Sequence, residues 1–330
     1  MLRKKKLSVG VIGIGKMGML HASIVNTIPD VQLSALYDKN SLVVRFASKT
    51  FTDICVTDNL ERFSDLSLDA VYVTTPIPTH YSILKAIYSI GMARNLFVEK
   101  TLASSYEQAA KLCQEAKAAG GVTMVGYMSR FAPTFKKVKA LLQEEAIDKI
   151  LSFKAYAYAS DFENTKVRAS SIKGGATRDL GAHVIDLSLW FFGDLEVKPT
   201  TPETSAVEIT DSGSCFKVRN SNGLIGEFDI SWSKAGYRLP EFGLSIRGSK
   251  GVITVNSDFV KLERIGMENT TLYRQNLNDR VPFLLGASEY YREDEHFLNS
   301  VLQDGSAVPD FSTASKVDLL IDQVEHLMVA

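Results

Sequence analysis

The sequence has little of what marks secreted, disulfide-stapled or membrane-spanning chains. Only three of its 330 residues are cysteine, and Cys55, Cys113 and Cys215 are far apart with no CxxC pair. An odd number of scattered cysteines is untypical of a disulfide framework and indicates thiols in a reducing compartment. No apolar run reaches the ~20 residues that cross a bilayer. The opening MLRKKK lacks the apolar run and cleavage site of a secretory signal. We therefore expect a cytoplasmic protein.

An excess of charge of either sign is also lacking. Thirty-seven basic residues face thirty-eight acidic ones, for a formal net charge of −1. No basic stripe with interleaved aromatic residues occurs, so we expect no nucleic-acid partner and no membrane partner. Hydrophobic residues make up 45 % of the chain, which is typical of globular proteins. The length is sufficient for about two domains.

The first part of the chain alternates short apolar runs with helix-like segments. Strands are predicted at LSVGVIGIG, VQLSALYD, DAVYVTT, NLFVEK and VTMVGY, and helices at 17–28, from 41, at 79–90 and at 105–119. Repeated strand–helix–strand units predict a parallel sheet covered by helices on both faces. We therefore assign residues 1–126 to a doubly wound α/β domain.

After residue 126 the rhythm changes to successive strands. A helix is predicted at 131–145, and the following LSFKAYAYAS places Leu151, Phe153, Ala155 and Ala157 on one strand face. Helices are further predicted at 182–192, 288–303 and 312–327, and strands at GLIGEFDISWS, FGLSIRG, GVITV and FVKLER. Strands that follow one another without helices indicate an antiparallel sheet. Residues 127–330 are thus predicted to form an α+β domain with a large, open, mostly antiparallel sheet.

A glycine-rich turn near the start is the first candidate site. Gly13, Gly15 and Gly18 fit G-x-G-x-x-G, with Ile14, Lys16 and Met17 between them, and the motif follows a strand and opens a helix. In a dinucleotide-binding turn the first glycine permits the bend, the second admits the pyrophosphate and the third lets helix and strand pack. The alternative is a tight turn that binds nothing. The context favours a nucleotide.

The expected nucleotide is NAD. Asp38 lies twenty residues beyond Gly18, at the end of the second predicted strand. A carboxylate there accepts hydrogen bonds from the adenosine ribose and repels a 2′-phosphate. Lys39 and Arg45 lie nearby and soften this preference, so NADP stays open as the alternative.

Three further motifs carry polar side chains at predicted strand or helix ends. Thr74, Thr75 and Pro76 end one strand, and Glu99 and Lys100 end the next. The carboxyl ends of parallel strands face the cofactor crevice. In the second half, Asp179 and His183 are four residues apart, so they converge if a helix begins at His183.

With these motifs in place, the sequence resembles the Gfo/Idh/MocA oxidoreductase family over nearly its whole length. The resemblance is carried by the glycine motif, by Thr75-Pro76 with His80, and by Glu99-Lys100-Thr101. It continues in GYMSRFAP, in the G-G-x…D-x-x-x-H-x-x-D pattern at 174–186, and in the closing YYREDEHFLNSVLQDGSAVPDF. It implies a Rossmann domain, a second domain whose open sheet often mediates oligomers, and hydride transfer between nicotinamide and a secondary alcohol of a sugar or polyol.

The resemblance also implies roles for particular residues. Lys100 sits between nicotinamide and substrate, Glu99 approaches the nicotinamide ribose, His183 accepts the alcohol proton, and Asp179 holds the substrate or the base. The glycine motif with Asp38, and Thr74, Thr75, Pro76 and His80, belong to the cofactor site. Proton removal as hydride leaves suits an imidazole near neutral pH. An ammonium near the hydroxyl stabilises the developing alkoxide.

Some positions depart from the family pattern. Thr101 replaces the usual proline after Lys100, which removes a backbone restraint beside that lysine. By analogy Met128, Ser129, Asp161 and Tyr237 line the substrate pocket, and Ser129 and Arg238 stand where inositol-type members carry other residues. Inositol itself is therefore a less expected substrate.

Other functions remain as alternatives. Pairs such as His183 and Asp186, or Glu293 and His296, lack a third metal ligand, so we expect no metal. A glycosidase that uses tightly bound NAD for a transient oxidation is one alternative to a dehydrogenase. A non-catalytic sugar sensor is the other, and the presence of Lys100, Asp179 and His183 argues against it. We expect a homo-oligomer, either a dimer or a tetramer.

Overall fold

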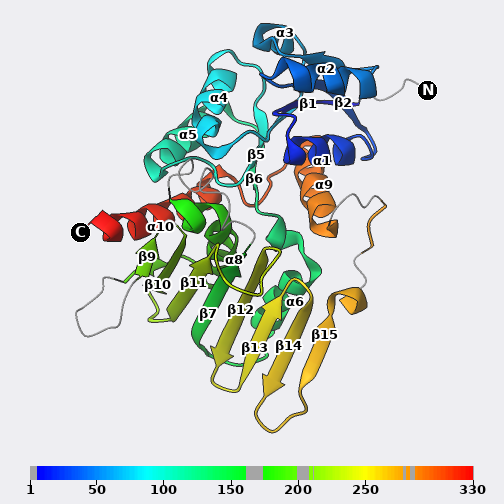
Figure 1. Ribbon diagram of the computed structural model, residues 1–330. Coiled ribbons are helices and arrows are strands. Elements are labelled where there is room, and N and C mark those ends of the chain that lie inside the picture. The colour runs from blue at the N-terminus through cyan, green and yellow to red at the C-terminus, as the bar shows by residue number, and fades with distance from the viewer. Residues whose placement is uncertain are drawn as a thin grey trace. The chain divides into compact units, whose positions relative to one another are not determined.

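The computed structural model describes residues 6–160, 174–198, 208–210, 212–277, 280–282 and 287–329 (Figure 1). The chain divides into two compact units. One contains Met1–Met128 and Val281–Ser315, and the other contains Ser129–Arg280 and Lys316–Ala330. The sequence predicts one boundary after residue 126. The structure differs, because a segment near the C-terminus returns to the first unit.

The first unit is built on a parallel sheet with strand order β3-β2-β1-β4-β5-β6. This order is that of the doubly wound dinucleotide-binding fold, as predicted. Because the strands are parallel, their carboxyl ends lie at one edge of the sheet, and folds of this type bind ligands at that edge. The strands whose ends matter here are β1, β2, β4 and β5. The strands are β1 Leu7–Ile12, β2 Val31–Tyr37, β3 Cys55–Thr57, β4 Ala70–Val73, β5 Asn95–Glu99 and β6 Thr123–Gly126.

The helices of the first unit begin at recognisable signals. Side chains of Asn40, Asn59 and Ser105 accept hydrogen bonds from first-turn amides and so cap their helices. Every residue of β4 is buried, because helices cover the sheet. The helices are α1 Lys16–Val25, α2 Ser41–Thr50, α3 Leu60–Ser64, α4 Ile77–Ser89, α5 Tyr106–Ala119 and α9 Ser288–Leu302.

Helix α9 is the part of the first unit that the sequence assigns to the wrong domain. It packs against α1 and β6, beside the sheet (Figure 1). Its Phe297 is fully buried and meets the rings of Tyr72 and Phe97 at 5.4 and 5.7 Å between centroids. These strand side chains need an apolar cover, which Phe297 supplies from 200 residues beyond Phe97 in the chain. Periodicity along the chain cannot reveal such a partner.

The second unit is built on a mixed, mostly antiparallel sheet with order β15-β14-β13-β12-β7-β11-β10-β8, and β9 pairs with β10. Among the described strands of this sheet, only β7 and β11 pair in parallel. The strands are β7 Ile150–Tyr158, β8 Glu196–Val197, β9 Glu208–Thr210, β10 Gly213–Arg219, β11 Ile225–Ser231, β12 Glu241–Gly248, β13 Gly251–Asn256, β14 Phe259–Arg264 and β15 Thr270–Tyr273.

Helices cover one face of this sheet. Helix α8 (Ala182–Phe192) packs on β7 and β12, and α6 (Pro133–Gln143) packs on β13 and β14. Phe153, Ala155 and Ala157 are buried on the covered face as predicted, but Leu151 is 47 % exposed. The reason is local, since the register of β7 against β12 shifts between Arg247 and Gly248, beside this end of β7. The remaining elements are η1 (Met128–Phe131), the π-helical turn η2 (Thr177–Gly181), η3 (Arg274–Leu277) and α10 (Phe311–Val329).

Candidate active site

The glycine loop between β1 and α1 is held by two close approaches. Gly13 has φ of +97°, which favours glycine, and a Cβ there would lie 2.7 Å from Cγ2 of Thr75. A Cβ on Gly18 would lie 1.8 Å from the carbonyl oxygen of Gly13. The hydroxyl of Thr74 donates to the same oxygen at 2.7 Å. The first and third glycines are therefore required by the packing of the loop itself.

Gly15 is different, because the protein's own packing does not require it. A Cβ added at Gly15 would meet no atom within 4 Å. Gly15 precedes α1, whose first residues are Lys16 and Met17, and no described side chain caps this helix terminus. The first-turn amides of a helix are a natural binding site for phosphate. A glycine with open space at this point fits the close approach of a pyrophosphate.

Asp38 follows β2 and is tied directly to the glycine loop. Its Oδ2 accepts a hydrogen bond from the amide of Ile14 at 2.8 Å, and its Oδ1 accepts one from the amide of Asn40 at 2.9 Å. Each carboxylate oxygen has a further lone pair for a ribose hydroxyl. The sequence places Asp38 near the loop by spacing alone, and the structure supplies the contact.

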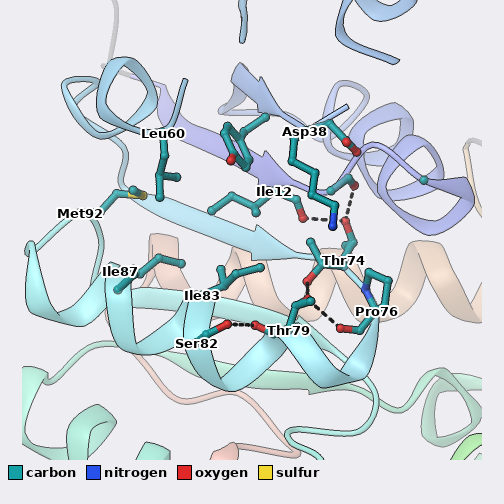
Figure 2. A pocket seen from close by; sticks show the side chains of 16 residues that line it. Ile12, Asp38, Leu60, Thr74, Pro76, Thr79, Ser82, Ile83, Ile87 and Met92 are labelled. Carbon is teal, nitrogen blue, oxygen red and sulfur yellow. Dashed lines mark hydrogen bonds between the residues drawn. The ribbon is translucent and has the colours of Figure 1, made fainter. Parts of the chain in front are cut away.

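A cavity of about 400 Å³ opens beside this loop (Figure 2). The end of the cavity near the glycine loop is lined by Asp38, Thr74 and Pro76 (Figure 2). The other end is apolar and lies between Leu60, Ile83 and Met92. A volume of this order suits a flat, mostly apolar ring with a polar handle. Gly13, Gly15, Lys39, Thr75 and Thr79 also line it.

His80 lies behind the loops rather than in the cavity lining. It is fully buried, with Nδ1 at 2.8 Å from the carbonyl oxygen of Thr101 and Nε2 at 2.7 Å from that of Thr75. Burial lowers the pKa of the imidazole, and the contacts with the two carbonyls oppose that shift. His80 thus joins the loop after β4 to the loop after β5, which indicates a bracing role beneath the predicted cofactor site.

Glu99 ends β5 and Lys100 follows it. The Glu99 carboxylate accepts from the Lys100 amide at 3.1 Å through Oε2, and its Oε1 lies 3.0 Å from Nε2 of His21. Burial pushes the pKa of Glu99 up, but the hydrogen bond with His21 and the charges of His21 and Lys100 lower it overall. Glu99 is therefore ionised at neutral pH. The peptide bond between Lys100 and Thr101 is cis.

Asp179 and His183 lie in the second unit, on one continuous helical stretch. Asp179 belongs to the π-helical turn η2, and His183 lies in the first turn of α8, which follows directly. The predicted helix at 182–192 is thus extended upstream by that turn. His183 is 8 % exposed, and its ring lies 4.5 Å from that of Phe242. The turn η2 packs on β7 and β11, and α8 packs on β7 and β12, so both residues lie on the covered side of the sheet.

Of the four predicted substrate residues, two lie in η1. Met128 is the last residue of the first segment of the first unit. Ser129 is buried and is the first residue of the second unit. Asp161 lies outside the described residues. Tyr237 contacts Tyr158 and Tyr156 at 4.9 and 6.5 Å between ring centroids. Those tyrosines alternate with buried Ala155 and Ala157, so Tyr237 lies toward the face opposite to His183.

Comparison with known proteins identifies the chain. The profile "Oxidoreductase family, NAD-binding Rossmann fold" (GFO_IDH_MocA) matches residues 7–127, and the profile "GFO/IDH/MocA C-terminal domain" matches residues 135–254. The chain belongs to the Gfo/Idh/MocA oxidoreductase family. This confirms the resemblance carried by the sequence motifs, and with it the NAD-binding Rossmann domain.

Individual relatives of the family are distant. Myo-inositol 2-dehydrogenase of Thermotoga maritima is 25 % identical over 255 residues, which cover 75 % of this chain and 74 % of that protein. Oxidoreductase YrbE of Bacillus subtilis is 24 % identical over 190 residues, 57 % of this chain and only 54 % of its own length. Levoglucosan dehydrogenase, solved in complex with NADH, superposes with a TM-score of 0.84 at 22 % identity and covers 98 % of this chain and 97 % of its own. This last likeness shows the shared fold.

Two buried arginines that form ion pairs beside Asp179 and His183 are not indicated by the sequence. The guanidinium of Arg178, next to Asp179, donates to Asp318 and Asp322 at 2.8 Å and to Glu325 at 3.1 Å, all on α10. Arg130 donates to both oxygens of Asp186 at 2.7 Å. Burial raises the pKa of Asp186 although Arg130 opposes it. A single arginine in a sequence does not indicate its partner. The only sequence signal for the contacts of Arg178 is the spacing of Asp318, Asp322 and Glu325, which puts three acids on one face of a helix.

Two absences apply to the part of the chain that the structure describes. Within it, no group of three histidine, cysteine, aspartate or glutamate side chains is arranged to hold a metal ion. Likewise, none of the described helices combines the length and apolar character needed to span a bilayer.

Proposed function

We propose that the protein is an NAD-dependent dehydrogenase that transfers a hydride between nicotinamide and a secondary alcohol of a sugar, cyclic polyol or nucleotide sugar. One observation carries the proposal. The glycine loop is bonded to Asp38 and Thr74 beside a cavity of about 400 Å³, in a chain of an NAD-binding oxidoreductase family. The names of relatives that act on inositol and levoglucosan support the substrate class.

The residues of the first unit fit NAD. The amides at the start of α1 would hold the pyrophosphate, with Gly15 leaving room for it. Asp38 would accept from the adenosine ribose, which favours NAD over NADP. Thr74 and His80 keep the surrounding loops in place. Bound NAD supplies the hydride acceptor.

The proton and charge chemistry falls to three side chains. We assign His183 as the base that accepts the alcohol proton, because an imidazole suits proton transfer near neutral pH. Asp179, on the adjoining helical turn, is assigned to orient that base or the substrate. Lys100 is assigned to stabilise negative charge on the substrate oxygen as the hydride leaves.

The test is spectrophotometric. The purified protein is mixed with NAD or NADP and with polyols, free sugars, sugar acids and nucleotide sugars, and reduced nicotinamide is followed by absorbance. Lys100→Ala and His183→Ala are measured beside it, with Lys111→Ala on the exposed face of α5 as control. We expect turnover with one substrate class, faster with NAD, that both site variants lose and the control keeps.

A negative result has a defined meaning. Tight NAD binding without net reduction across the whole panel would overturn the dehydrogenase proposal. It would favour a glycosidase that regenerates its bound NAD, which release of sugar from glycosides would reveal. Lys100→Ala with unchanged behaviour would instead favour a sugar sensor.

We also propose that the protein is a homo-oligomer, a dimer or a tetramer. Helices α6 and α8 cover one face of the large sheet, while Tyr156, Tyr158 and Asp229 lie on the other. A broad sheet face rich in tyrosine suits burial against a second subunit. Light scattering after size exclusion measures the mass, and a monomer at micromolar concentration would contradict this proposal.

A further inference from the structure

A buried cluster of acids and one imidazole lies in the first unit, where side chains of α1, β5 and α9 meet. His21 comes from α1, Glu99 from β5, and Glu293 and Asp294 from α9 (Figure 1). Of these four, the resemblance implies a role in the cofactor site for Glu99 alone. His21, Glu293 and Asp294 are fully buried, each with 0 % of its surface exposed.

The imidazole connects the interior to the end of β5. Nδ1 of His21 lies 2.8 and 3.0 Å from the two oxygens of Asp294, and Nε2 lies 3.0 Å from Oε1 of Glu99. Burial raises the pKa of Asp294, and the charge and hydrogen bond of His21 oppose that shift. With both acids ionised, the carboxylates only accept hydrogen bonds, so the ring donates from both nitrogens as an imidazolium. The side chain of Glu99 is 13 % exposed, which makes it the end of this chain that a ligand can reach.

The ring has little freedom to turn. Its centroid lies 5.0 Å from that of Phe97 and 5.6 Å from that of Tyr72, and Tyr290 meets it edge-on at 6.5 Å. Burial pushes the pKa of His21 down, but the charge and hydrogen bond of Asp294, with those of Glu99, raise it well above its ordinary value. The charged groups that act on the ring are Glu99 on β5 and Glu293 and Asp294 on α9, while Lys100 acts on Glu99 and Glu289 acts on Glu293. The hydroxyl of Tyr72 on β4 also faces Asp294 and lowers the pKa of that carboxyl.

We propose that His21 is a positioning residue for the cofactor: held by Asp294, it fixes the Glu99 carboxylate in one orientation at the carboxyl end of β5 for a hydrogen bond to the nicotinamide ribose. This rests on the proposed function, since it assumes that NAD binds at this sheet edge. If the imidazole becomes neutral, a lone pair on Nε2 faces Oε1 of Glu99 and the two repel each other. Glu99 then loses its fixed orientation.

Stability alone does not account for this arrangement. A buried ion network is commonly no more stable than apolar side chains of similar volume, because removing charges from water is costly. Glu293 makes the location less favourable still, since neither of its buried oxygens has a hydrogen-bond partner among the described residues. An imidazolium anchored at one end and presenting a carboxylate at the other is, however, what a preorganised ligand contact requires.

The test measures binding of NADH by fluorescence titration, which needs no substrate. The variants are His21→Gln, Glu99→Gln and the double variant, with Tyr290→Phe as a control that keeps the ring beside His21. We expect His21→Gln to weaken NADH binding about tenfold, as the loss of one charge-assisted hydrogen bond does. Because His21 acts through Glu99, we expect the double variant to bind as Glu99→Gln does. Losses that multiply, or a His21→Gln protein with unchanged affinity, would overturn the proposal.

A second variant guards against misfolding of the first. Asp294→Asn keeps an acceptor for Nδ1 but removes the charge that helps to hold the proton on His21. We therefore expect the pH at which NADH affinity falls on the alkaline side to move to lower pH than in the wild type. An unmoved pH profile contradicts the inference. If the wild type binds NADH but oxidises no alcohol, the proposed function fails while this inference is still tested.

Discussion

The carboxylate of Asp38 and the backbone amide of Ile14 form a hydrogen bond of 2.8 Å, which fixes the acid after β2 against the glycine loop. Ile14 of the glycine loop and the acid after β2, which have twenty-three residues between them in the chain, thus lie side by side. The bond leaves the carboxylate of Asp38 at the rim of the cavity, where we expect it to favour NAD over NADP.

Asp38→Asn tests this expectation. The amide oxygen of asparagine can still accept from Ile14, but the charge that repels a 2′-phosphate is gone. We expect the ratio of NADH to NADPH affinity to fall by about tenfold or more, with Lys39 at the same rim free of its acidic neighbour. Fluorescence titration with both cofactors measures the ratio. An unchanged ratio would show that Asp38 does not select the cofactor.

The glycine loop offers a matched pair of substitutions. Gly18→Ala puts a methyl group at 1.8 Å from the oxygen of Gly13, whereas Gly15→Ala puts one into open space. We expect Gly18→Ala to lower the melting temperature and to abolish cofactor binding. Gly15→Ala is expected to keep the wild-type melting temperature and yet to bind NADH more weakly, because the pyrophosphate can no longer approach. Equal effects of both substitutions would contradict these different roles.

The first unit could be predicted largely from the sequence because its signals are local. Apolar runs such as LSVGVI become buried strands, and side-chain caps at Asn40 and Ser105 start helices where the pattern predicts them. The same locality explains the glycine loop, since strand, turn and helix are contiguous.

What could not be predicted depends on partners distant in the chain. Nothing near Phe297 in the sequence indicates that its ring covers Tyr72, and nothing near His21 indicates a hydrogen bond with Asp294. The order of elements along the chain therefore places α9 in the other domain. Leu151 has no partner in β12 because the register of the two strands shifts there, so the alternation seen in the sequence does not carry over to its burial. Buried charges were missed for the same reason, since a sequence shows the charge and not its partner.

Glu293 predicts a pH-dependent stability. Burial raises the pKa of this carboxyl well above its ordinary value, with the nearby acids adding to the shift and His21 opposing it. The folded protein therefore holds a proton that the unfolded chain releases above pH ~4.5, so this group costs stability as pH rises, by up to about 1.4 kcal/mol per pH unit until its folded pKa is reached. We expect Glu293→Gln to melt at the wild-type temperature near pH 4.5 and at a progressively higher one from pH 5 to 8. The exposed Glu61→Gln should show no such trend, and a constant offset for Glu293→Gln across pH would count against the assignment.

Arg178 and Lys316 contrast a buried with an exposed ion pair formed with one helix. The Arg178 guanidinium is fully buried against three carboxylates of α10, whereas Lys316 on α10 pairs with Asp194 at 2.6 Å with both side chains largely in water. Arg178→Met leaves buried Asp318 without its cation, a change that costs about 3–5 kcal/mol. We expect a large drop in melting temperature with faster amide hydrogen exchange in α10, and lower turnover because Asp179 lies on the same helical turn. Lys316→Met should change neither, since exposed pairs contribute little. Comparable losses in the two variants would mean that charge count on α10, rather than the buried contact, holds this helix to η2.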